Sequence, residues 1–113
     1  MEVNQKTVEW FKIFNDRQEA LQALNENEPR LLLANNKRLC LLRKQDQLFV
    51  VAEKCPHNGE SLTKGSVNYL GEIICPWHGY RFNVITGRES DERCRDLETF
   101  PIRESEDGIF VGM

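Results

Sequence analysis

Two short cysteine–histidine segments constrain this chain more than any other feature of its sequence. Cys55-Pro-His57 is followed by Gly59, and Cys75-Pro-Trp-His78 is followed directly by Gly79. Seventeen residues separate the two segments, and together they contain both histidines of the chain. Thiolate sulfur and imidazole nitrogen suit iron–sulfur or zinc centres and few others. The pattern therefore predicts one metal site built by two separate loops.

Length and composition favour one ordinary domain spanning residues 1–113. The chain is 40% hydrophobic and 29% charged, which is enough apolar material for a real core. Its net charge of −3 does not support a nucleic-acid partner. No apolar run approaches the ~20 residues needed to span a bilayer, and residues 1–6 lack the apolar region of a secretory signal. We expect a soluble, cytoplasmic protein without a membrane partner.

The remaining cysteines have plainer interpretations. Four cysteines could form two disulfides, but a chain of this kind does not need them, and histidine neighbours favour metal at Cys55 and Cys75. Cys40 lies in an apolar run and is predicted to be a buried free thiol. Cys94 lies in the charged run 91–96 and is predicted to be exposed. Neither Cys40 nor Cys94 is expected to bind metal.

Short strands separated by turns predict an all-β antiparallel sandwich or barrel. The expected strands are residues 8–14, 30–34, 39–43, 48–53, 66–69, 72–74, 81–84, 98–103 and 109–111, with one short helix over 16–24. The expected core strand residues are Phe11, Phe14, Leu31, Leu33, Leu41, Phe49 and Val51. The acidic stretch 89–107 is expected to be a solvated face. Each Cys/His segment follows a strand, so the two loops can face each other.

At these residues the sequence resembles the Rieske iron–sulfur family. The resemblance rests on both Cys/His segments together with Gly65, Phe82 and Thr86-Gly87. It implies a [2Fe–2S] cluster, with Cys55 and Cys75 on the inner iron and His57 and His78 on the outer one. It also implies three stacked antiparallel sheets, at most one short helix, and a small cluster-binding subdomain over about residues 54–84.

The chain departs from the Rieske proteins of respiratory cytochrome bc complexes, as that family is known. Glu60 and Trp77 stand where those proteins carry two disulfide-linked cysteines, and Tyr80 and Phe82 stand where they carry a serine and a tyrosine near the cluster. Fewer hydrogen-bond donors leave the reduced cluster less stabilised, which predicts a low reduction potential. The resemblance is to the soluble ferredoxins of ring-hydroxylating dioxygenase systems.

The first functional hypothesis is a one-electron carrier that is not itself catalytic. It would pass electrons from a flavin-containing NAD(P)H-dependent reductase to a terminal oxygenase or similar enzyme in transient encounters. The sequence contains no G-x-G-x-x-G nucleotide fingerprint, and both histidines are already used. The alternatives are a Rieske-like small subunit of a nitrite-reductase-type complex, a redox sensor, and a structural zinc site. Trp77 is interpreted as shielding the cluster or contacting a partner, and Lys64 and Arg81 as ordinary surface charges.

Overall fold

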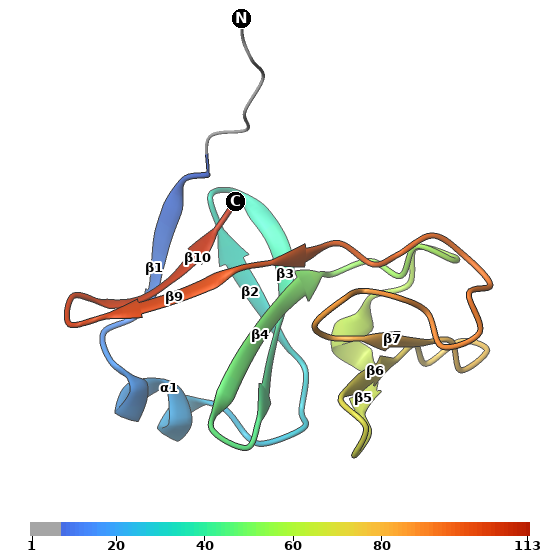
Figure 1. Ribbon diagram of the computed structural model, residues 1–113, viewed down its shortest axis with the longest axis horizontal. Helices are drawn as coiled ribbons and strands as arrows, with labels where there is room; N and C mark the ends of the chain where they lie inside the picture. The colour runs from blue at the N-terminus through green and yellow to red at the C-terminus, as the bar shows by residue number, and fades with distance from the viewer. Residues whose placement is uncertain (1–7) are drawn as a thin grey trace, which may run out of the picture.

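The computed structural model describes residues 8–113. The expectation for residues 1–6 therefore lies outside the described part. Three antiparallel sheets form successive layers, and the Cys/His loops lie at the end of the molecule that carries the third sheet (Figure 1).

The first sheet contains β1 (Trp10–Phe14), β10 (Gly108–Gly112) and β9 (Ile102–Ser105), in that spatial order. The second contains β2 (Arg30–Ala34), β3 (Lys37–Lys44), β4 (Gln47–Ala52) and β8 (Thr99–Phe100). The third contains β5 (Ser66–Val67), β6 (Glu72–Ile74) and β7 (Arg81–Asn83).

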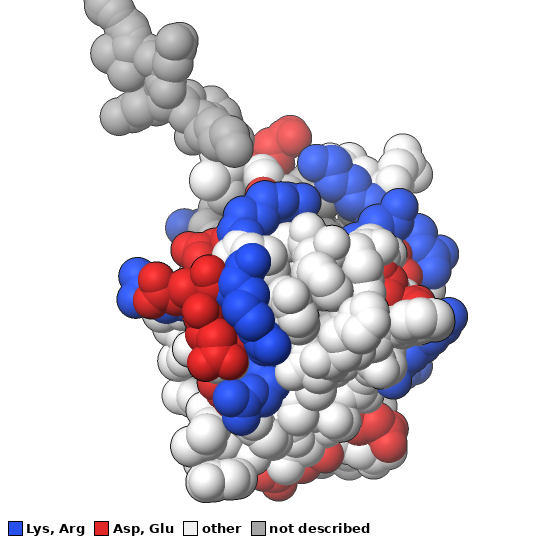
Figure 2. Space-filling view, turned by 90° about the vertical axis from the view of Figure 1, so that its right-hand side faces the viewer, with Lys and Arg blue, Asp and Glu red and all other residues white. Residues whose placement is uncertain are grey.

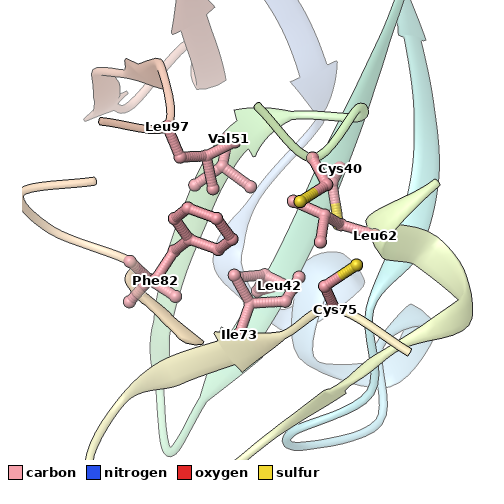
Figure 3. Close-up of a cluster of buried hydrophobic side chains, with 10 residues drawn as sticks. Cys40, Leu42, Val51, Leu62, Ile73, Cys75, Phe82 and Leu97 are labelled. Carbon is pink, nitrogen blue, oxygen red and sulfur yellow. The ribbon is translucent and has the colours of Figure 1, made fainter. Parts of the chain in front are cut away.

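The second sheet is buried on both faces, which explains the continuous apolar run in β3. Successive side chains of a strand point to opposite faces. Leu39 and Leu41 accordingly join the core shared with the first sheet, whereas Cys40 and Leu42 join the core shared with the third. Figure 3 shows the core between the second and third sheets, in which Cys40 and Cys75 lie among apolar side chains such as Leu42, Leu62 and Phe82. The predicted all-β fold with three stacked sheets is confirmed.

Local signals place most elements where the sequence predicts them. Asn35 and Asn36 have φ of 50° and 61°, as a two-residue hairpin turn between β2 and β3 requires. Helix α1 (Arg17–Ala23) begins after Asp16, whose carboxylate accepts the backbone N–H of Glu19 at 2.8 Å. A short 3₁₀ helix, η1 (Leu62–Lys64), follows the first Cys/His loop.

Two predictions about the strands are wrong. Leu31 and Leu33 are expected in the core but are 36% and 65% exposed. They lie on β2, which is an edge strand, and the core on that face of the sheet is built on β3 and β4. The single strand expected over 98–103 is two strands, β8 and β9, which belong to different sheets. Pro101 lies between them and has no N–H to donate, so it suits this change of sheet.

The helices of residues 8–113 include none that is both long and apolar enough to cross a bilayer.

Candidate metal centre

Two loops of matching construction carry the four cysteine and histidine side chains. The first Cys/His loop (residues 55–60) follows β4, and the second Cys/His loop (residues 75–80) joins β6 to β7. The backbone N–H of Cys55 donates to the carbonyl of Glu60 at 2.8 Å, and that of Cys75 donates to the carbonyl of Tyr80 at 2.8 Å. Each cysteine is thus fixed at the base of its loop, and the histidine follows on the projecting part.

The second Cys/His loop turns through two successive residues in the left-handed region. His78 and Gly79 both have φ of 69°. Glycine adopts this conformation freely, whereas a side chain there costs about 1–2 kcal/mol. Strain of this kind is characteristic of functional sites, where the surrounding structure enforces a particular side-chain direction. Glycine at position 79 is the kind of residue that such a turn favours, whereas nothing in the sequence shows that His78 shares its conformation.

The two cysteine side chains lie together in the interior. Cys55 and Cys75 are 2% and 1% exposed and belong to the same apolar core. Burial raises the pKa of the Cys75 thiol, a hydrogen bond from the backbone of Trp77 lowers it, and hydrogen bonding and charge from the neighbouring Cys55 raise it further. All four cysteines of the chain are free thiols. The site therefore offers a protected pair of sulfur donors.

The two imidazoles form a second pair closer to the surface. The ring centroids of His57 and His78 are 5.4 Å apart, with the planes at 70°. His57 is half-buried, and His78 is exposed. Nδ1 of His57 is buried and has no hydrogen-bond partner. A buried polar atom without a hydrogen bond lowers the stability of the fold by about 1–3 kcal/mol. Coordination of a metal by the lone pair of the His57 nitrogen would offset this cost.

The donors are arranged as two pairs. Among residues 8–113, no three His, Cys, Asp or Glu side chains surround a common point at which a single ion could bind. A buried pair of thiols and an outer pair of imidazoles, one of them with an orphaned nitrogen, match the chemistry of a diiron cluster that takes sulfur on one iron and nitrogen on the other. The residues present therefore fit such a cluster.

Comparison with known proteins agrees with this chemistry. Residues 9–101 match the family model of the Rieske [2Fe-2S] domain. This chain belongs to the Rieske [2Fe-2S] family. The cofactor implied by the resemblance in the sequence, a Rieske [2Fe–2S] cluster, is the cofactor of that family. The match covers most of the chain, including β1 and every strand of the second and third sheets, and it ends before β9 and β10.

Individual relatives of the Rieske family are found among oxygenase ferredoxins. Ferredoxin CarAc of Metapseudomonas resinovorans is 33% identical over 75 residues, which cover 65% of this chain and 68% of the relative. The anthranilate 1,2-dioxygenase ferredoxin subunit of Burkholderia cepacia is 30% identical over 84 residues, covering 74% and 73%. Apoptosis-inducing factor 3 of mouse and of human is 38% identical over 64 residues, or 57% of this chain, and that match spans only 9% of the relative's length.

Solved structures show the same Rieske fold. A complex of reduced oxygenase and oxidized ferredoxin in carbazole 1,9a-dioxygenase matches with a TM-score of 0.73 at 26% identity, covering 90% of this chain and 91% of that chain. A Mycobacterium tuberculosis protein described as an NADH-dependent nitrite reductase small subunit matches with a TM-score of 0.78 at 18% identity, covering 96% and 97%. At that identity the second match shows the fold alone.

The other residues that the sequence singles out have mixed outcomes. Cys40 is fully buried in the core, as predicted, and burial raises its pKa to about 12. Cys94 is half-buried against the same core, so the prediction of a surface position is wrong. Trp77 is 57% exposed, and its ring meets His78 edge-on with centroids 6.0 Å apart. Phe82 is completely buried and offers no hydroxyl.

Sequence reasoning missed the polar groups that support each loop. Glu53, just before the first Cys/His loop, is buried and binds Arg38 and Ser61 at 2.9 and 2.8 Å. Hydrogen bonding to Arg38 lowers the pKa of Glu53 despite the opposing effect of burial. Glu89 is 0% exposed and pairs with Arg93, so it is an exception to the solvated face predicted over 89–107, whose other charged residues are exposed. A spacing of four residues brings charges together on a helix, but this segment is not helical, so nothing in the sequence signals either the pair or its burial.

Proposed function

We propose that Cys55 and Cys75 ligate one iron of a Rieske [2Fe–2S] cluster and that His57 and His78 ligate the other. The pairing of two buried thiols with two outer imidazoles supports this assignment. When bound, such a cluster accepts and releases one electron, at a potential raised by its neutral imidazole ligands relative to an all-cysteine cluster. The single domain of residues 1–113 and the cluster-binding subdomain of about 54–84 are part of the same proposal.

The protein's own residues divide the site into a dry side and an open side. Cys55 and Cys75 lie in the core with Phe82 and Leu62, which exclude water from the sulfur end. His78 is exposed, so the imidazole end is the short route for an electron between the interior and a partner. Electrons would therefore both enter and leave the cluster at the exposed imidazole end.

From this we propose a soluble, cytoplasmic one-electron carrier that has no catalytic activity by itself. It would accept electrons from a flavin-dependent NAD(P)H reductase and deliver them to a terminal oxygenase or similar enzyme. Ferredoxins of oxygenase systems are among its relatives, and one related ferredoxin has been solved in complex with its oxygenase. None of the four cysteines forms a disulfide, which also suits a reducing compartment.

The surface around the loops suits brief encounters with such partners. Figure 2 shows the end of the molecule beyond the third sheet, where residues other than Lys, Arg, Asp and Glu fill the centre and Lys and Arg lie on both flanks. Acidic side chains form their largest group on the left, with smaller ones at the other edges. Trp77 contributes an exposed aromatic ring beside His78. Redox encounters use small, weak interfaces with a limited apolar centre and a charged rim.

Reduction and reoxidation of the cluster-loaded protein test this proposal. The chain is loaded with iron and sulfide, mixed with NADH and a flavin reductase of a Rieske oxygenase system, and followed by its visible absorbance. We expect bleaching by one electron per cluster, followed by recovery when the matching oxygenase and its substrate are added. A loaded protein that exchanges electrons with neither enzyme contradicts the carrier function, and copurification with a large reductase subunit would favour the nitrite-reductase alternative.

A further inference from the structure

Three planar groups stack at the edge of the metal centre. The ring of Tyr80 lies against the ring of His57, with centroids 3.8 Å apart and planes within 13° of parallel. The guanidinium carbon of Arg93 lies over the Tyr80 ring, 3.9 Å from its centroid. A cation over an aromatic face is attracted by the ring quadrupole. A fixed positive charge is thus connected to His57 through a single aromatic ring.

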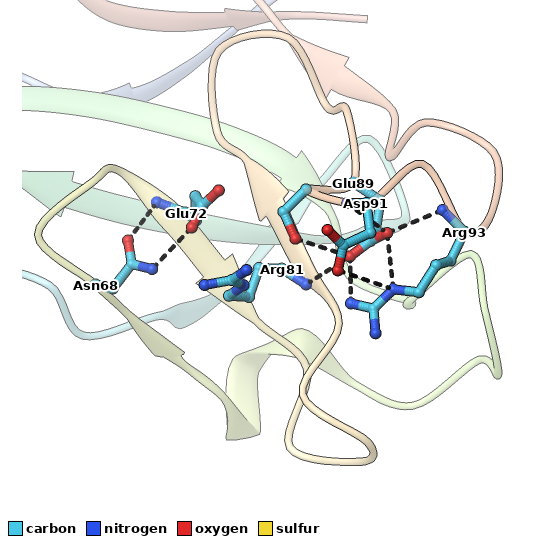
Figure 4. Close-up of polar contacts among 7 residues, drawn as sticks. Asn68, Glu72, Arg81, Glu89, Asp91 and Arg93 are labelled. Carbon is cyan, nitrogen blue, oxygen red and sulfur yellow. Dashed lines mark hydrogen bonds and ion pairs between the residues drawn. The ribbon is translucent and has the colours of Figure 1, made fainter.

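The buried carboxylate of Glu89 holds the guanidinium in place. Glu89 accepts hydrogen bonds from Nε and Nη2 of Arg93 at 3.0 and 2.5 Å. It also accepts the backbone N–H groups of Arg81, Asp91 and Arg93 at 3.3, 3.1 and 2.9 Å (Figure 4). The Arg93 guanidinium holds the pKa of Glu89 far below its usual range, although burial opposes this. The carboxylate is therefore ionised, and it ties Arg93 to the start of β7.

A neighbouring ion pair in the same segment shows what an ordinary surface pair looks like. Arg88 and Glu92 are also four residues apart, but their charged atoms are 3.9 Å apart and both side chains are about two-thirds exposed. An exposed ion pair of this kind contributes little to stability and holds no other side chain in place. Arg93 differs because its partner is completely buried and its free face is occupied by Tyr80.

We propose that Arg93, fixed by Glu89, is a positioning residue for the metal centre: it clamps Tyr80 against His57 and raises the reduction potential of the cluster. The inference rests on the proposed function, because it takes His57 as a ligand. Clamping a planar ring against His57 restricts rotation of the imidazole, so its nitrogen keeps one direction. Reduction adds negative charge to the cluster, and a cation held in partly buried surroundings favours that added charge.

Redox titration of charge-matched variants tests the electrostatic part. Arg93→Gln and Arg88→Gln remove the same charge from the same segment, and only the first disturbs the stack. We expect Arg93→Gln to lower the equilibrium constant for reduction about tenfold, a shift of about 59 mV for one electron, and Arg88→Gln to shift it much less. Equal midpoints for these two variants would overturn the inference.

Magnetic resonance of the histidine nitrogens tests the geometric part. In reduced, cluster-loaded protein we expect Tyr80→Leu and Arg93→Gln to change the coupling of one histidine nitrogen, whereas Tyr80→Phe, which keeps the ring, stays close to the parent. A coupling that is unchanged in Tyr80→Leu overturns the clamp.

If Arg93→Gln binds no cluster, ¹⁵N-histidine spectra of the metal-free chains replace the titration. A His57 signal that moves in Arg93→Gln but not in Arg88→Gln supports the clamp, and one that moves in neither overturns it.

The parent protein separates failure of this inference from failure of the proposed function. A loaded parent without histidine-nitrogen coupling would refute the ligand assignment, and the inference with it. A parent with normal coupling and variants with an unchanged midpoint and unchanged coupling would refute the role of Arg93 alone.

Discussion

The imidazole rings of His57 and His78 meet edge-to-face, with centroids 5.4 Å apart, although they belong to loops that leave different sheets. This contact depends on two backbone hydrogen bonds of the same design, one at the base of each Cys/His loop. The histidine pair lies outside the cysteine pair, and a core closed by Phe82 lies behind both.

Substitution of one sulfur donor should remove the cluster while leaving the fold of the second sheet intact. Cys55→Ser or Cys75→Ser is expected to reduce bound iron to less than a tenth of the parent value, because serine is a poor ligand for iron in such clusters. Cys94→Ser is the matched control and should bind iron normally. Iron and sulfide analysis with visible absorbance checks this, and full iron content in Cys75→Ser would refute the sulfur assignment.

Gly65 should be far more sensitive to alanine than a glycine that merely occupies a turn. A Cβ at Gly65 would lie 2.0 Å from the carbonyl oxygen of Ile74, the residue before Cys75, so β5 and β6 would have to separate. Gly71 has φ of 78° but meets nothing closer than 3.8 Å. We expect Gly65→Ala to lose the cluster or the fold, and Gly71→Ala to cost only about 1–2 kcal/mol of unfolding free energy. Denaturant unfolding compares the two, and equal losses would contradict the close packing.

Acid should remove the stabilisation that comes from Glu89. A carboxyl group whose folded-state pKa is depressed stabilises the fold above its unfolded pKa of about 4.3, and this contribution is lost as the pH falls toward the folded-state value. Glu89→Gln should therefore lower the unfolding free energy by about 1–3 kcal/mol at pH 7, with a smaller difference below about pH 4. Glu92→Gln, at an exposed position, is the control. Tryptophan fluorescence during denaturant unfolding measures this, and a difference that stays constant down to pH 3 would rule the explanation out.

The reduction potential should lie at the low end of the range for Rieske centres, which is roughly −150 to +300 mV. Phe82 is buried and has no hydroxyl to donate, and the Tyr80 ring is stacked against His57. Fewer donors leave the reduced cluster less stabilised. Redox titration at neutral pH should give a midpoint below zero, and a positive midpoint would mean that other donors compensate.

Elements with strong local signals could be predicted from the sequence. The Asn35-Asn36 hairpin, the Asp16 helix cap and the paired Cys/His segments each depend on residues close together in the chain. The exposure of Leu31 and Leu33 could not be predicted, because it depends on β2 being the edge strand of its sheet.

The side chains that support the site could not be predicted from the sequence either. Glu89 looks like one more charge in an acidic stretch, and only the packing of that segment against β7 encloses it. In the sequence, Tyr80 looks like a residue too long to replace a serine donor, whereas in the structure its ring stacks on His57. Such roles come from contacts between distant segments, which spacing along the chain does not report.

Nitrogen coupling in the reduced protein shows directly whether His57 and His78 hold the cluster. The chain contains only two histidines, so ¹⁵N-histidine labelling of untagged protein marks both proposed nitrogen donors and nothing else. We expect two inequivalent, strongly coupled histidine nitrogens in the pulsed EPR spectrum of the dithionite-reduced cluster. An all-sulfur spectrum without nitrogen coupling, or a colourless protein that binds zinc in place of iron, would contradict this expectation.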